Sequence, residues 1–142
     1  MAEAYMNHVG RDRWRAWSAG SNPAGAPNPF ALETLKRHHI PIQSGADAPS
    51  SKSWNEFTSD NAPLMDAIIT VCDNAAGEAC PVWPARAGQA PQKLHWSFPD
   101  PAVATGSEID KCAAFEMVFA AIKARVDLFI AEDSANQNRI RE

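Results

Sequence analysis

The chain has 142 residues and a formal net charge of −4, and its hydrophobic and charged fractions are ordinary for a globular protein. Its 13 Lys and Arg residues form no basic run, which argues against nucleic-acid binding. No apolar stretch has the length of a membrane-spanning helix, and the first residues do not resemble a signal peptide. We therefore expect a cytoplasmic protein without a membrane partner, in a compartment where thiols stay reduced unless their chemistry is transient or catalytic.

The first half of the chain carries signals for four short elements separated by turns. In chain order they are a helix over 1–9, a strand over 14–18, a helix from 29 to about 37 and a single helical turn over 53–57. Gly10 can end the first helix, and Asn28 followed by Pro29 is a cap followed by a first-turn proline. Residues 41–50 are expected to form a loop.

The second half predicts two strands and one long helix. Residues 66–71 form a strongly apolar run with no alternation of polar and apolar positions, which indicates a strand buried on both faces as in a parallel sheet. A second strand is expected over 93–98. Ser107 and Asp110 resemble a capping box, from which a helix is expected to run to about Glu132.

An apolar stripe at helical spacing identifies the buried face of that helix. The stripe consists of Cys112, Phe115, Phe119, Ile122, Val126 and Phe129. On this basis Cys112 is assigned to the core. Strands that alternate with helices predict an α/β layer fold, with one domain over 1–132 and a polar tail over 133–142.

Two of the three cysteines lie in the most specific stretch of the chain. Cys72 directly follows the strand predicted over 66–71, and Cys80 follows eight residues later, after a loop rich in small and polar residues. Such a pair suits reversible disulfide chemistry if the loop folds back far enough for a bridge. The alternative is that both are simply small buried residues, since free cysteines are commonly buried.

Metal and cofactor binding are weaker possibilities. Cys72, Cys80 and His95 do not have the spacing of a zinc site, and no fourth ligand stands out. The glycine-rich motifs of nucleotide-binding loops are absent from the sequence. We therefore expect neither a metal nor a cofactor.

The segment from Cys80 to Arg86 formally matches the C-x5-R signature of cysteine-dependent phosphatases. Such a loop holds an oxyanion with successive backbone N–H groups. Pro81 and Pro84 each remove one donor, and Trp83 is too bulky for a close cradle. We reject this match as a catalytic loop.

Asp100 is a candidate general acid. It lies between Pro99 and Pro101 on a rigid loop that follows the strand predicted over 93–98. An aspartate placed in this way can protonate an oxyanion leaving group. An aspartate beside a proline is, however, more often only part of a turn.

Taken together and in chain order, these motifs resemble those of thioredoxin-coupled arsenate reductases, in the low-molecular-weight protein tyrosine phosphatase superfamily. The resemblance rests on residues 18–20, the helix from Pro29, and residues 51–53, 66–84 and 95–102. It implies a three-layer α/β fold of the phosphotyrosine phosphatase I type, in which a parallel sheet is flanked by helices.

The resemblance also implies roles for three residues. In that family a first cysteine in a C-x5-R loop attacks arsenate, a second releases arsenite and a third leaves a disulfide that thioredoxin reduces. By position, Cys72 resembles the second cysteine, Cys80 the third and Asp100 the general acid. Ala102 stands where tyrosine phosphatases carry an aromatic residue, which favours the reductase branch. The implied partners are arsenate, in the complete protein, and thioredoxin or a comparable dithiol.

The chain departs from the family pattern at its start. In the family, the first strand and its C-x5-R loop come before the helix that resembles residues 1–9. We therefore expect a fold that lacks the central first strand, a chain that is inactive alone and a strand edge able to pair with another copy. Two alternatives remain open: a tyrosine phosphatase-like protein, or a non-catalytic dithiol module that binds thioredoxin.

Overall fold

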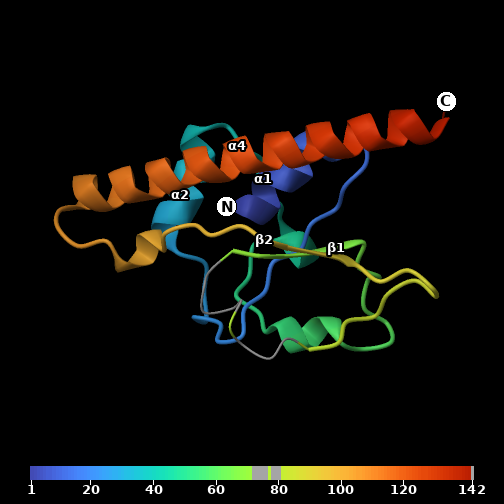
Figure 1. Ribbon diagram of the computed structural model, residues 1–142. Coiled ribbons are helices and arrows are strands. Elements are labelled where there is room, and N and C mark those ends of the chain that lie inside the picture. Colours follow the sequence, from blue (N-terminus) through green and yellow to red (C-terminus); the bar gives the residue numbers. More distant parts are fainter. Residues whose placement is uncertain (72–76, 78–80, 142) are drawn as a thin grey trace. The chain divides into compact units, whose positions relative to one another are not determined.

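The computed structural model describes residues 1–71, 77 and 81–141, and for residues 137–141 the backbone alone (Figure 1). The chain forms two compact units. The helical unit comprises Met1–Trp17, Asn28–Pro49 and Asp100–Glu142, and the strand unit comprises Ser18–Pro27 and Ser50–Pro99. Cys72 and Cys80 lie outside the described residues.

Three α-helices build the helical unit. They are α1 (Ala2–Val9), α2 (Pro29–Arg37) and α4 (Glu108–Arg141); the short 3-10 helix η1 (Gly45–Asp47) follows α2, and η3 (Pro101–Val103) precedes α4. Both α1 and α2 pack against α4, which is the longest element of Figure 1. The predicted α2 cap is confirmed, because the Asn28 Oδ1 accepts a hydrogen bond of 2.9 Å from the Phe30 N–H.

The core of the helical unit lies along one face of α4. Phe115, Phe119, Ile122, Val126 and Phe129 are all buried, which confirms most of the predicted stripe. Aromatic rings from the other segments pack on this face: Tyr5 on Phe119 and Phe30 on Phe115 at centroid distances of 5.7 Å, and Trp14 on Phe129 at 5.0 Å. Each buried aromatic side chain contributes about 1.5–3 kcal/mol through removal of apolar area from water.

The two ends of α4 differ in how well the sequence predicts them. The capping box is confirmed: the Ser107 N–H donates to the Asp110 carboxylate at 2.8 Å, and the Asp110 N–H donates to the Ser107 Oγ at 3.2 Å. The end expected near Glu132 is wrong, because the helix continues to Arg141. Arg13 forms an ion pair with Asp133 and donates to the Ser134 Oγ, so this part of α4 is tied to the turn after α1.

A parallel sheet of two strands forms the centre of the strand unit. Strand β1 (Ala67–Thr70) pairs with β2 (Gln92–His95) in a register that runs from Ala67 opposite Gln92 to Thr70 opposite His95. The parallel pairing and the helices confirm the α/β fold class. The helical turn expected near residue 54 is also present, as the 3-10 helix η2 (Trp54–Phe57).

The strand predicted over 14–18 is wrong. Instead, Gly20 forms a single parallel bridge with Ser53, in which the Gly20 N–H donates to the Lys52 carbonyl at 3.0 Å. Trp14 belongs to the helical unit, where its indole N–H donates to Asp133 at 3.1 Å. This long-range contact holds residues 14–17 away from a sheet.

The prediction that β1 is buried on both faces is also wrong. All four of its residues are half-buried, and Val71 directly after it is exposed. Within the described part of the chain the sheet has two strands, so each strand has a hydrogen-bonding partner on one side. No helix among the described residues is both long and apolar enough to cross a bilayer. The division into a domain over 1–132 and a polar tail over 133–142 stays a prediction.

Candidate functional site

The carboxyl ends of β1 and β2 meet at one edge of the parallel sheet. Main-chain hydrogen bonds continue beyond both strands: the Trp96 N–H donates to the Thr70 carbonyl at 2.8 Å, and the Phe98 N–H donates to the Val71 carbonyl at 3.2 Å. This edge is where ligands commonly bind in open α/β sheets. Val71, the last described residue before Cys72, is therefore hydrogen-bonded to Phe98, which precedes Asp100 by two residues in the sequence.

A polar pair lies at this edge. The Thr70 Oγ1 is 2.8 Å from the His95 Nδ1, and the imidazole is exposed. The two residues are register partners, so the short distance follows directly from the parallel pairing. Sequence reasoning missed this pair because a Thr–His contact 25 residues apart has no local signal. The hydroxyl fixes the imidazole orientation beside the start of the cysteine loop.

The described residues on either side of the segment that carries the cysteines are anchored within the strand unit. Its start is held by the bond from Phe98 to Val71. Its end is held by Trp83, whose indole N–H donates to the Trp54 carbonyl at 3.1 Å and whose ring meets the Trp54 ring edge-on at 5.9 Å. The strand unit therefore holds Val71 and Trp83, which lie in the sequence on either side of the two cysteines.

Asp100 begins a short 3-10 helix. Its Oδ1 accepts a hydrogen bond of 2.9 Å from the Ala102 N–H, and the side chain is exposed. One carboxylate oxygen therefore serves as the cap of η3, and the other has no hydrogen-bond partner among the described residues. The side chain is held in a single orientation while its second oxygen stays accessible for proton transfer.

Two other residues considered in the sequence analysis contact charged groups: Arg86 lies near a carboxylate, and Cys112 lies near a guanidinium group. Arg86, at the end of the rejected C-x5-R match, lies 3.6 Å from the Asp66 carboxylate. The assignment of Cys112 to the core is wrong in degree, since its thiol is half-buried and lies 3.8 Å from an Arg37 guanidinium nitrogen. Among the described residues, no group of three or more His, Cys, Asp or Glu side chains is arranged to hold a metal.

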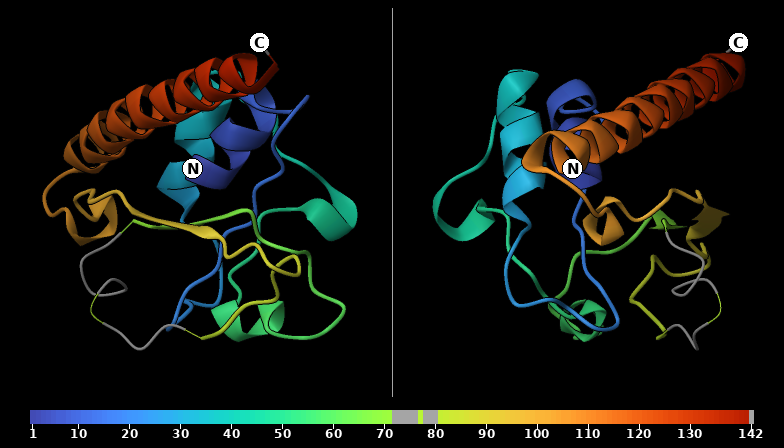
Figure 2. Two further views of the ribbon diagram at one scale, coloured as in Figure 1. Left: turned by 45° about the vertical axis from the view of Figure 1, so that its right-hand side comes forward. Right: turned by 90° about the vertical axis from the view of Figure 1, so that its left-hand side faces the viewer.

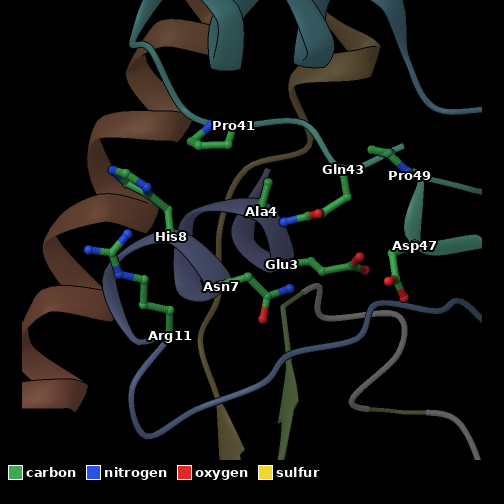
Figure 3. Close-up of a pocket in the computed structure, with 9 residues that line it drawn as sticks. All are labelled: Glu3, Ala4, Asn7, His8, Arg11, Pro41, Gln43, Asp47 and Pro49. Carbon is green, nitrogen blue, oxygen red and sulfur yellow. The ribbon is translucent and has the colours of Figure 1, made fainter. Parts of the chain in front are cut away.

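A separate hollow of about 190 Å³ lies in the helical unit between α1 and the segment after α2 (Figure 3). Figure 3 shows His8 and Arg11 on one side of it and the carboxylates of Glu3 and Asp47 on the other. Asp47 is paired with Arg15 at 2.8 Å. Charges of both signs border the hollow, so its lining does not select a multiply charged oxyanion such as arsenate.

Comparison with known proteins gives consistent results at three levels. A family model described as "Low molecular weight phosphotyrosine protein phosphatase" matches residues 1–139. The chain is 33% identical over 118 residues to the arsenate reductase of Bacillus subtilis (strain 168), covering 83% of this chain and 76% of that protein. It is 31% identical over 129 residues to the arsenate reductase of Shouchella clausii (strain KSM-K16), covering 91% and 84%.

A solved structure described as "An arsenate reductase in reduced state" is also similar. The TM-score is 0.61 at 20% sequence identity, and the match covers 92% of this chain and 86% of that chain. At this identity the likeness establishes the fold alone. It confirms the α/β fold expected from the resemblance.

Proposed function

Because the chain belongs to the low molecular weight phosphotyrosine protein phosphatase family, we propose that it carries the second and third thiols of an arsenate reductase relay. The observation that carries this proposal is that β1 ends two residues before Cys72 in the sequence, and that the described residues on either side of the cysteine segment are anchored at Val71 and Trp83. The relatives reported above, all named arsenate reductase, support the choice of substrate.

The relay has three covalent steps. A first cysteine forms a sulfur–arsenic bond with arsenate, and a hydroxyl leaves as water. The Cys72 thiolate then attacks the sulfur of that cysteine, so the sulfur–arsenic bond breaks and arsenic leaves with the electron pair as arsenite. Cys80 attacks the Cys72 sulfur, which releases the first cysteine and leaves a Cys72–Cys80 disulfide.

Asp100 is proposed as the general acid of the first step. Loss of a hydroxyl from arsenate requires a proton, and the accessible oxygen of Asp100 can supply one. The bond from Ala102 keeps this carboxyl in a single orientation. Replacement by Asn keeps the cap acceptor and removes the acid, so it separates the two roles of this side chain.

The proposed partners are arsenate and a dithiol reductant, with thioredoxin as the reductant and the cytoplasm as the compartment. Self-association through a free edge of the sheet remains part of the proposal, because each strand has one strand partner within the described chain. The 142 residues contain one C-x5-R match, at Cys80 to Arg86, and prolines remove two of its donors. We therefore expect no arsenate turnover by these 142 residues alone.

The test is formation and thioredoxin-dependent reduction of the Cys72–Cys80 bridge. Mild oxidation of the purified chain should lower its mass by two hydrogens, and peptide mapping should identify a disulfide between Cys72 and Cys80. Thioredoxin should then restore both thiols. Cys112→Ser is the matched control and should behave like the wild type, whereas Cys80→Ser should form no intramolecular bridge. A bridge to Cys112, or one that resists thioredoxin, would contradict the assignment. Arsenate turnover by the chain alone would contradict the expectation that the first step of the relay needs a further thiol.

A further inference from the structure

Helix α4 carries a second apolar stripe on the side opposite to the core. Helices α1 and α2 cover the buried face of α4. On the opposite face of α4, residues three or four positions apart are also apolar. These positions are Ile109, Ala113, Met117, Ala120, Ala124 and Leu128. We call this set the outer stripe. Amphipathic helices of globular proteins normally place charged residues on that side.

The outer stripe is exposed along its whole length. The exposed fractions of Ile109, Met117 and Leu128 are 80%, 75% and 46%, and the three alanines between them are exposed as well. Figure 2 shows α4 as one long unbroken helix, on which positions three or four residues apart are neighbours, so the stripe is continuous. A contiguous apolar strip bounded by charges is typical of a surface that binds another protein.

We propose that the outer stripe binds the same stripe of a second copy of this chain, with the two helices antiparallel. In an antiparallel pair the numbers of facing residues have a constant sum. If Met117 lies opposite Ala120 of the partner subunit, then Ala113 lies opposite Ala124 of the partner subunit. Ile109 then lies opposite Leu128 of the partner subunit. At the centre each Met117 side chain packs on an alanine, further out alanine faces alanine, and Ile109 and Leu128 fill the space at both ends.

The charges beside the stripe are complementary in this register. On one flank, Asp110 lies near Arg125 of the partner subunit, and on the other flank Glu116 lies near Lys123 of the partner subunit. The twofold axis repeats each pair, so four pairs of opposite sign border the strip. A parallel pairing would instead place Arg125 between Lys123 and Asp127 of the partner subunit, where repulsion and attraction offset each other. The charge pattern therefore favours the antiparallel pairing of two copies.

Matched alanine substitutions on the same face test the proposal. Ala120→Glu places a charge at the centre of the contact, twice per dimer, and should raise the dimer dissociation constant by about 100-fold or more, because buried charges without partners are costly. Ala135→Glu is the control. It lies on the exposed side of the same helix but beyond the overlap, opposite a position that precedes Glu108 of the partner subunit. It should leave the dissociation constant within about threefold of the wild-type value.

Sedimentation equilibrium over a wide concentration range measures these constants, and far-UV circular dichroism checks that both variants keep wild-type helicity. A wild-type dimer that Ala120→Glu dissociates and Ala135→Glu does not would support the proposal. A wild-type chain that is monomeric at every concentration would overturn it. A dimer that survives Ala120→Glu would also overturn it and would point to another surface, such as the sheet edge.

The orientation has its own readout. A spin label at Ala135→Cys, with the three native cysteines replaced by Ser, reports the distance between the two copies. The antiparallel register separates these positions by roughly 33 residues, or about 50 Å along the axis at 1.5 Å per residue. A parallel pair would place the labels about 10 Å apart. A measured distance near the shorter value would overturn the antiparallel arrangement.

Discussion

The hydroxyl of Tyr5 joins α1 to α4 through one hydrogen bond, and Tyr5→Phe isolates what that bond contributes to stability. The ring is 4% exposed and packs edge-on against Phe119. Its Oη donates to the Asp127 Oδ1 at 2.7 Å, and Lys123 donates to the other oxygen of the same carboxylate at 3.3 Å. The substitution keeps the ring and removes only the donor.

The expected loss in the free energy of unfolding is about 1 kcal/mol. Hydrogen bonds to charged groups are worth about 1.5–3 kcal/mol when both partners are buried. The Asp127 side chain is 47% exposed, so water can replace the lost donor and the value falls to the lower end. Urea unfolding followed by circular dichroism, at one protein concentration for all variants, measures this difference.

The pH dependence gives the same contact a second signature. Burial, and then the bond to Asp127, raise the pKa of Tyr5 above its usual value. A raised pKa in the folded state means that the contribution is complete below the unfolded value of about 10 and is lost as the pH rises toward the folded pKa. The advantage of the wild type over Tyr5→Phe should therefore be constant at neutral pH and shrink above about pH 10. A difference below about 0.3 kcal/mol at pH 7, or one that does not change with alkaline pH, would refute the reasoning.

Two further substitutions test the core and an ion-pair cluster on α4. Phe119→Ala removes a ring that is fully buried between Tyr5 and His38, and it should cost about 3–5 kcal/mol in urea unfolding; a loss below about 1.5 kcal/mol would contradict its place in the core. Glu116→Gln should be less stable than the wild type at pH 7, and this difference should shrink as the pH falls below the unfolded value of about 4.3. The reason is that hydrogen bonds, first from His38 and then from Arg37, lower the pKa of Glu116, and a lowered pKa gives stability that is lost as the pH falls through the folded value. An unchanged difference between pH 3 and pH 7 would exclude an ionic origin.

Elements marked by local chemistry were predicted closely from the sequence. The cap at Asn28 and the capping box at Ser107 each need partners within three residues, and both formed as expected. The start of α4 is therefore encoded locally. Its end is not, because the contacts that hold Asp133 come from Arg13 and Trp14, 119 or more residues away in sequence.

The candidate site shows the same division. The position of Cys72 at the end of an apolar run can be read from the sequence, and so can the cap chemistry of Asp100. The contact between Thr70 and His95 depends on the parallel register of β1 and β2, which no local pattern specifies. The strand expected at 14–18 failed for a related reason, since the alternative contacts of Trp14 in the helical unit are visible only after folding.

The two stripes of α4 explain why the fate of one face could be predicted and that of the other could not. Phe119 and Val126 on one side, and Met117 and Ala124 on the other, recur with the same helical spacing, so periodicity alone does not say which side is buried. Aromatic rings favour the first side, because α1 and α2 supply Tyr5 and Phe30 to pack against it. The second side lacks aromatic residues and is rich in alanine, which suits close approach by another helix better than burial under a loop. Helix α4 is apolar on both sides, but its own chain covers only one of them, so the other side is available to a partner. The charges at Asp110 and Arg125 make the α4 helix of a second copy a suitable partner.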